Sequence, residues 1–296
     1  MNKETIENWF KSLQDNICQE IEKTDEKGKF EEDLWQRPQG GGGRTRIIRG
    51  GNIIEKGGVN FSAVSGPTPD KILQALKIDK ADFYATGVSI VMHPQSPMVP
   101  VIHMNVRYFE MSNGISWFGG GIDLTPHYVD DEDAQYFHSQ IKSVCDAHHG
   151  SYYPEFKNWA DDYFYIKHRN ETRGIGGIFF DRLSATPEIS MEQRWEFVKD
   201  VGQLFAPTYT HFMSKNKDIE YGENEKQWQY LRRGRYVEFN LVLDKGTKFG
   251  LDTDGRTESI LMSLPPQANW EYNYEVAPGS KEEKTLSLLK KGVDWV

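Results

Sequence analysis

The Asn-Gly pair at positions 113 and 114 constrains the fold of this chain more than any other local feature. It separates two strand-like segments, residues 99–111 (VPVIHMNVRYFEM) and residues 115–123 (ISWFGGGID). An Asn-Gly pair in such a setting is a strong signal for a β-hairpin, because both residues tolerate a positive φ. We therefore expect the two segments to pair as antiparallel neighbours in a sheet.

The rest of the chain predicts more strands and helices around this hairpin. Strand patterns cover residues 46–66, with glycine turns, and residues 84–92, 173–181, 234–243 and 257–265. Helical patterns cover residues 69–78, 129–148, 154–170, 190–215 with a break near Pro207, 222–233, and 280–292 with a Ser280/Glu283 capping box. The two types do not alternate regularly. We expect a single α+β domain over residues 1–296, with a large, mainly antiparallel β-sheet flanked by α-helices.

The N-terminal segment is predicted to be a helix followed by a loop. Apolar residues recur at helical spacing from Ile6 to Ile21, and residues 1–36 are assigned to an acidic N-terminal helix. Residues 37–45 contain four consecutive glycines and are predicted to form a glycine-rich loop, or a mobile lid that becomes ordered over a ligand. The Gly-Lys-Ser/Thr ending of a phosphate-binding loop does not follow them.

Charge and cysteine content narrow the class of protein. The net charge of −9 argues against binding to nucleic-acid phosphates or anionic membranes, and no apolar run is long enough to span a bilayer. Residues 1–36 hold ten acidic residues and no arginine, unlike a mitochondrial presequence. Cys18 and Cys145 are too few for a disulfide framework. We expect a cytoplasmic protein.

A polar row runs along the first strand of the hairpin. With a period of two, His103, Asn105 and Arg107 fall on one face, and the apolar residues between them fall on the other. Ser89 and His93 continue this spacing on the preceding strand. A half-exposed strand with a polar outer face gives the same pattern, so the row alone does not distinguish a site from a surface.

The glycines at 119–121 are predicted to lie beside this polar row. Without side chains they would leave a hollow, walled by Trp117 and Phe118, that a flat ligand could enter. Asp123, at the end of the hollow, could accept hydrogen bonds from N–H groups of that ligand.

Several long motifs, in order, resemble the oxygen-dependent coproporphyrinogen III oxidase family. They are IHMNVRYFE, WFGGGIDLTPHY, KHRNETRGIGGIFFD, LRRGRYVEFNLV and GTKFGLDTDGRTESILMSLPP, and the likeness runs from about residue 33 to the C-terminus. The resemblance implies oxidative decarboxylation of two propionates of coproporphyrinogen III to vinyl groups, giving protoporphyrinogen IX. It also implies a broad antiparallel sheet flanked by helices, and a homodimer formed through about residues 233–270.

The resemblance also implies roles for individual residues. Ser89 and the stretch Asn105-Val106-Arg107 would bind substrate, His103 would donate a proton, and Asp123 would lie against the pyrrole nitrogens. Asp254-Gly255-Arg256 would form a second substrate-binding motif, although a small residue is commoner in the family at the position of Asp254. Arg107 and Arg256 are the cations that we expect to hold the propionates, since arginine binds carboxylates bidentately.

Two alternatives to a cofactor-free oxidase remain open, a metal-dependent enzyme and a non-catalytic binding protein. The family is described as needing O2 as a co-substrate and no organic cofactor. A metal-dependent version would use histidines at the positions assigned to a divalent metal in bacterial relatives, which are His93, His103, His138 and His168 here. No two of them have the spacing of a short zinc motif, so we do not expect a required metal. A non-catalytic tetrapyrrole-binding protein is the other alternative.

The hairpin and the resemblance disagree about Asp123. A two-residue turn at Asn113-Gly114 would set Met104 opposite Asp123 and direct the carboxylate to the apolar face, away from His103. The resemblance requires Asp123 beside His103. We therefore expect an odd-length loop or a β-bulge between residues 111 and 123, with the glycine run as the favoured place for a bulge. Asp123→Asn is expected to preserve the fold and to lower the rate by about 10²-fold or more.

Overall fold

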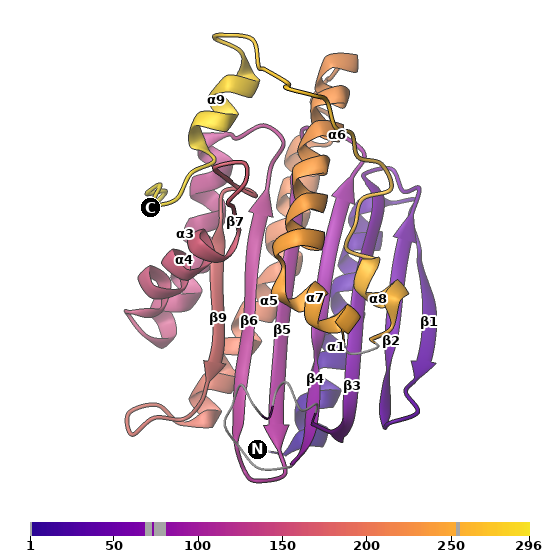
Figure 1. The fold of residues 1–296 in the computed structure, drawn as a ribbon, viewed down its shortest axis with the longest axis vertical. Coiled ribbons are helices and arrows are strands. Elements are labelled where there is room, and N and C mark those ends of the chain that lie inside the picture. The colour runs from indigo at the N-terminus through magenta and orange to yellow at the C-terminus, as the bar shows by residue number, and fades with distance from the viewer. Residues whose placement is uncertain (1, 69–72, 74–80, 253–254) are drawn as a thin grey trace.

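A seven-stranded antiparallel sheet forms the centre of the molecule (Figure 1). The structure is a computed structural model that describes residues 2–68, 73, 81–252 and 255–296. The strands follow the order β1 (Phe30–Gln36), β2 (Gly41–Arg49), β3 (Ile54–Pro67), β4 (Asp82–Pro94), β5 (Val101–Met111), β6 (Ser116–Thr125) and β9 (Gly177–Leu183). A separate two-stranded ladder joins β7 (Tyr165–Ile166) and β8 (Glu171–Thr172). The predicted α+β class with a large antiparallel sheet is confirmed.

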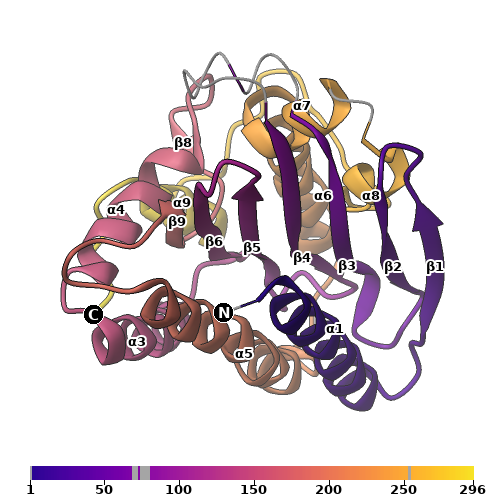
Figure 2. The same ribbon diagram turned by 90° about the horizontal axis from the view of Figure 1, so that it is seen from below.

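Helices cover both faces of the sheet, as the end-on view in Figure 2 shows. One face carries α1 (Lys3–Asp25), α3 (Asp131–His148) and α5 (Met191–Asn216). The opposite face carries α6 (Glu223–Glu238), the π-helix η1 (Phe239–Leu243), α7 (Lys245–Asp252) and α8 (Thr257–Leu261). Two more helices, α4 (Tyr152–Tyr163) and α9 (Lys281–Leu288), lie beyond the β9 side of the sheet.

The main apolar core lies between the sheet and the first group of helices. The predicted amphipathic face of the N-terminal helix is confirmed, since Ile6, Ile17 and Ile21 are fully buried in this core. Core-facing residues of β5, such as Met104 and Val106, pack against it from the sheet. The alternation that buries these residues turns the polar row of β5 toward α6 and η1.

The glycine-rich segment is only partly a loop, which corrects the prediction for residues 37–45: residues 37–40 form the turn between β1 and β2, and residues 41–45 lie in β2. The N-terminal helix ends at Asp25, residues 30–36 form β1, and Gly41–Gly43 belong to β2. The indole of Trp35 occupies the space where a side chain of Gly43 would lie, and its N–H donates to Thr45 Oγ1 at 3.1 Å. These glycines therefore allow close packing between neighbouring strands.

Both strands predicted near the C-terminus are wrong. Residues 234–243 continue α6 and form η1, and residues 257–261 form α8. Tyr236 and Phe239 are three residues apart, and in a helix both rings reach the same side, where they are buried. Aromatic residues favour strands by intrinsic propensity, but here the packing of both rings against the sheet stabilises the helix instead.

Smaller differences concern helix ends. Helix α5 passes through Pro207 without the expected break, and α4 ends at Tyr163 instead of reaching residue 170. The predicted Ser280 cap is present, because Ser280 Oγ accepts the N–H of Glu283 at 3.1 Å. The helix predicted over residues 69–78 lies outside the described residues except for position 73.

The hairpin between β5 and β6 has a three-residue loop, so the predicted odd length is confirmed. The N–H of Met111 donates to the carbonyl of Ile115, and the N–H of Gly114, with φ 88°, donates to the carbonyl of Met111. From Glu110 and Ser116 onward the register runs without a bulge to Val101 and Thr125. The glycine run therefore does not shift the β5–β6 register, and His103 pairs directly with Asp123.

Candidate active site

The polar face of the sheet carries the predicted site residues in rows. Residues paired across an antiparallel ladder have side chains on the same face. Ser89 of β4 pairs with Asn105 of β5, which pairs with Gly121 of β6. His103 and Asp123 form the adjacent row. The side chain of Val106 points into the core and is fully buried, so any contact of Val106 with a ligand on this face would involve its backbone.

His103, Asp123 and Arg173 form a connected array on this face. His103 Nδ1 lies 2.7 Å from Asp123 Oδ1, and Arg173 Nη2 lies 2.8 Å from both carboxylate oxygens. Asp123 is 1% exposed, whereas the side chain of His103 is 21% exposed. The carboxylate is thus sealed behind the imidazole, and the imidazole faces the accessible side.

Arg173 is held in a cage of aromatic rings. Its guanidinium carbon lies 4.4 Å from the ring centre of Phe164, 4.6 Å from that of Tyr236 and 4.7 Å from that of Phe239. Asn240 of η1 accepts from Nη1 at 2.9 Å. The faces of aromatic rings attract a cation that has lost its hydration shell. The cage therefore lowers the free-energy cost of burying the Arg173 charge.

Arg173 also determines the charge state of Asp123. Burial by itself would raise the pKa of Asp123, but the Arg173 charge and the hydrogen bonds from His103 and Arg173 outweigh it and lower that pKa. The carboxylate is therefore ionised at neutral pH. Arg173 is the first residue of the strand predicted over residues 173–181, and no sequence pattern marks it as a site residue; in the structure it lies in the short connection between β8 and β9.

Arg107 lies at the next position of the polar face and is paired on both sides. Its Nη1 donates to Asn105 Oδ1 at 2.7 Å, and its Nη2 donates to Asp181 Oδ1 of β9 at 2.8 Å. Asp181 is a second site residue that no sequence pattern indicates. The guanidinium lies over Gly119, so the expected hollow above that glycine is filled by this ion pair.

The aromatic walls predicted for the hollow are only half right. Trp117 is on the polar face, where it stacks on Phe109 with ring centres 4.3 Å apart. Phe118 is fully buried on the core face and stacks on Trp195. Successive residues of a strand point to opposite faces, so both could not line one cavity.

The second predicted motif lies toward the β1 edge of the sheet. Arg256 donates to Ser259 Oγ at 3.1 Å and forms an ion pair with Asp33 of β1. Ser259 in turn contacts Thr45 of β2 at 3.0 Å. Gly255 precedes α8, and Asp254 lies outside the described residues. The polar face of the sheet between β1 and β5, called the polar floor below, spans four strand spacings, or roughly 19 Å. Arg256 and Arg107 lie near its two ends.

The four histidines considered as metal ligands each have a partner of their own within the fold, and that of His103 is Asp123. His93 is fully buried with Nε2 2.8 Å from the carbonyl of Ser263, and burial together with the Arg233 charge lowers its pKa to about 3. His138 lies between Tyr153 and the carbonyl of Ile175, and burial lowers its pKa to about 4. His168 pairs with Glu238. Within the described residues no group of three His, Cys, Asp or Glu side chains is arranged to hold a metal ion.

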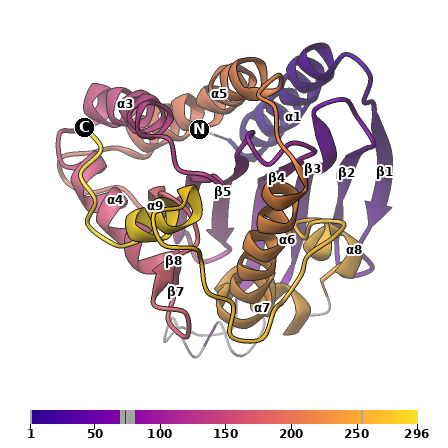
Figure 3. The same cartoon turned by 90° about the horizontal axis from the view of Figure 1, so that it is seen from above.

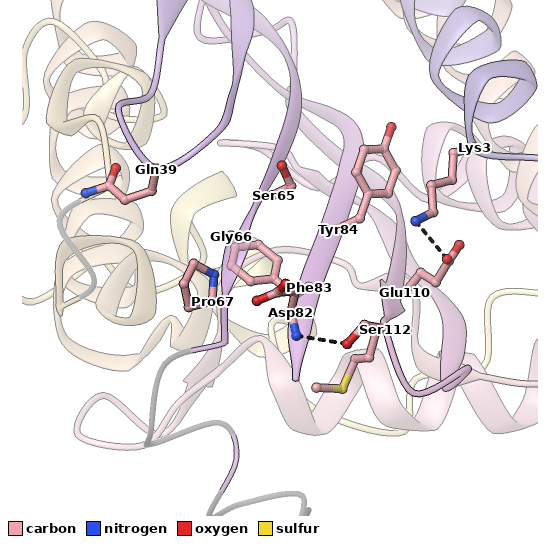
Figure 4. A pocket seen from close by; sticks show the side chains of 11 residues that line it. Lys3, Gln39, Ser65, Gly66, Pro67, Asp82, Phe83, Tyr84, Glu110 and Ser112 are labelled. Atoms are coloured by element: carbon pink, nitrogen blue, oxygen red, sulfur yellow. Dashed lines mark hydrogen bonds and ion pairs between the residues drawn. The ribbon is translucent and has the colours of Figure 1, made fainter. Parts of the chain in front are cut away.

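A separate cavity of about 570 Å³ lies where β3 and β5 end and β4 begins (Figure 4). Its lining residues are Lys3, Gln39, Ser65, Gly66, Pro67, Asp82, Phe83, Tyr84, Glu110, Met111 and Ser112. None of the predicted site residues is among them. Lys3 and Glu110 form an ion pair at its rim, 2.9 Å apart.

Comparison with known proteins agrees with the resemblance drawn from the motifs. The family model described as coproporphyrinogen III oxidase matches residues 5–295. The chain is also 49% identical over 298 aligned residues to a Drosophila melanogaster protein named oxygen-dependent coproporphyrinogen-III oxidase, and the match covers 96% of this chain and 76% of that protein. This chain belongs to the coproporphyrinogen III oxidase family.

Proposed function

We propose that this chain converts two propionates of coproporphyrinogen III to vinyl groups with O2, giving protoporphyrinogen IX, CO2 and hydrogen peroxide in haem biosynthesis. Each propionate loses CO2 and two electrons, and one O2 accepts those electrons. The observation that carries the proposal is the buried Arg173–Asp123 pair behind His103, at one edge of a polar floor that carries Arg107 and Asn105. Family membership supplies the substrate and the oxidant.

His103 is the proposed proton donor. Its Nδ1 is engaged by Asp123, so Nε2 is the atom that can exchange a proton with a ligand on the floor. Both oxygens of Asp123 already accept from Arg173, and the carboxylate is shielded from solvent. We therefore assign Asp123 a positioning role, orienting His103, in place of direct contact with the pyrrole nitrogens.

The two arginines are the proposed anchors for the propionates. The substrate carries four carboxylates, and a protein with a net charge of −9 needs local cations to bind it. Arg107 and Arg256 retain donors beyond those used in their present contacts, because a guanidinium carries five N–H groups. Asn105 lies beside Arg107 on β5, and Ser89 lies on the neighbouring strand β4. The Val106 backbone and residues 254–255 complete the proposed binding set.

The proposed reaction needs O2 and no organic cofactor or metal. We expect coproporphyrinogen III incubated in air to release CO2 and form the vinyl product, and the same incubation under argon to give neither. Treatment with a strong chelator before the assay is expected to leave the rate in air unchanged. Porphyrin binding without CO2 release would instead favour the tetrapyrrole carrier, and loss of the rate on chelation would favour the metal-dependent enzyme.

We also propose a cytoplasmic homodimer that associates through about residues 233–270. The two cysteines are free and buried, in keeping with a reducing compartment. No helix in the described part of the chain combines the length and apolar character needed to cross a membrane. Helices α6 and α7 lie on one face of the sheet (Figure 3). Leu241 and Val242 of η1, which follows α6, are exposed, as is Trp270, whose indole N–H donates to Glu238 of α6. Exposed apolar groups favour association.

The dimer is expected to give a mass of about twice 34.2 kDa in light scattering at micromolar concentration. Val242→Glu would place a charge in the proposed interface and is expected to shift the mass toward the monomer. Ile219→Glu, another exposed apolar position outside residues 233–270, is the matched control and is expected to leave the dimer intact. A monomer in the unmodified protein would contradict the proposal.

A further inference from the structure

The ladder between β6 and β9 contains an irregularity beside the polar floor. Phe118 pairs with Leu183, but Gly120 pairs with Phe180, so Asp181 and Arg182 stand opposite the single residue Gly119. Arg182 adopts φ 52°, a left-handed conformation that is costly for a residue with a side chain. Bulges and such strained residues gather at sites where a side chain must be aimed.

The side chain aimed here is Asp181. It continues the alternation of β9 on the polar face and reaches across β6 to Arg107, with Oδ1 2.8 Å from Nη2. Gly119 makes this crossing possible. A Cβ at position 119 would lie 2.5 Å from Asp181 Oδ1 and 2.8 Å from Arg107 Nη2, closer than side chains pack.

The guanidinium of Arg107 is consequently held from two sides. Asn105 binds Nη1 and Asp181 binds Nη2, while three of the five N–H groups remain for a ligand. Both partners of the ion pair are about one-third exposed, at 36% for Arg107 and 33% for Asp181, so a ligand can reach them. An arginine fixed before the ligand arrives loses less side-chain freedom on binding than a mobile one.

We propose that Asp181 is a positioning residue for substrate binding, which holds Arg107 across Gly119 so that its remaining donors meet one propionate. This inference rests on the proposed function and adds a residue to it. Three features of this region allow the Asp181–Arg107 contact: the bulge, the positive φ of Arg182 and the absence of a side chain at position 119.

The test measures kcat and KM for coproporphyrinogen III in air. Asp181→Ala is expected to raise KM about tenfold, with a smaller change in kcat, because Arg107 loses its charged partner and its fixed position. Asp181→Asn keeps an oxygen acceptor for Nη2 and is expected to stay within about threefold of the original KM. Glu188→Ala removes an equal charge from an exposed position seven residues further along the chain and serves as the matched control, with KM unchanged.

A double-mutant comparison tests whether Asp181 acts through Arg107. Arg107→Lys alone is expected to raise KM, and adding Asp181→Ala to it is expected to raise KM little further. Independent, multiplicative effects would overturn the inference, as would an Asp181→Ala variant whose KM is within twofold of the original. If that variant does not fold, Gly119→Ala replaces it, since its Cβ displaces the same pair and should raise KM similarly. A wild-type protein that releases no CO2 would instead refute the proposed function.

Discussion

Replacing His103 by asparagine is expected to lower kcat about 10²- to 10⁴-fold, the usual cost of removing a general acid or base. The asparagine amide can still donate to Asp123, so the buried carboxylate keeps a partner and the fold should be retained. An imidazole exchanges protons near neutral pH, whereas an amide does not. Release of CO2 measured beside a thermal unfolding curve separates the loss of chemistry from a loss of structure.

His148 provides a matched control for this substitution. It also pairs with an aspartate, with Nε2 2.7 Å from Asp200 Oδ2, but it lies on α3, on the opposite face of the sheet. His148→Asn is expected to leave kcat within about twofold of the original value, since surface pairs contribute little. A His103→Asn variant with a nearly normal kcat would remove His103 from the chemistry.

Asp123→Asn is expected to be costly for stability as well as for rate. From the sequence alone, this variant is expected to preserve the fold. The structure adds Arg173, which is 3% exposed and would lose its counter-charge. Removing one partner of a buried ion pair typically costs about 3–5 kcal/mol, a large part of the 5–15 kcal/mol that stabilises a native protein. Denaturant unfolding should show this loss together with a rate reduction of about 10²-fold.

Two further variants separate the charge effect from other effects of the substitution. Asp123→Asn combined with Arg173→Met removes both charges and is expected to recover much of the lost stability without recovering the rate. Asp146→Asn breaks an exposed ion pair with Lys142 and is expected to cost less than about 1 kcal/mol. If Asp123→Asn were as stable as Asp146→Asn, the buried pair would not be a stabilising element.

The lowered pKa of Asp123 also makes stability depend on pH in a defined direction. The folded protein binds a proton at Asp123 less readily than the unfolded chain does, so protonation favours unfolding. The contribution is fully present above the unfolded pKa of about 4 and is lost as pH falls through the lower folded value. Unfolding curves at pH 6 and pH 3 measure how much stability is lost on acidification. We expect this loss to be smaller in Asp123→Asn than in the original protein, because the asparagine does not titrate.

The parts of the fold and site that depend on residues close together in the sequence could be predicted from it. The hairpin at Asn113 and the alternation of His103, Asn105 and Arg107 are local patterns that tertiary contacts did not override. The odd-length loop could be inferred only because the family resemblance set Asp123 beside His103.

The missed residues reach the site from a distance along the chain. Arg173 is 50 positions from Asp123, and Asp181 is 74 positions from Arg107. No period or spacing connects such pairs. The helix at residues 234–238 was misassigned because the aromatic residues in it favour strands, and its packing partner Arg173 was unknown.

The order of the strands also has a consequence for how the site assembles during folding. Strands β1 to β6 pair with their sequence neighbours, so their contacts close short loops, whereas β9 joins β6 only after α3 and α4 have been traversed. The β5–β6 hairpin brings His103 and Asp123 together early, but the carboxylate has no cation until the segment that carries Arg173 arrives. Burial of Asp123 before that moment is unfavourable. We therefore expect the hairpin to stay open to water until β9 docks, so that the reactive face closes last.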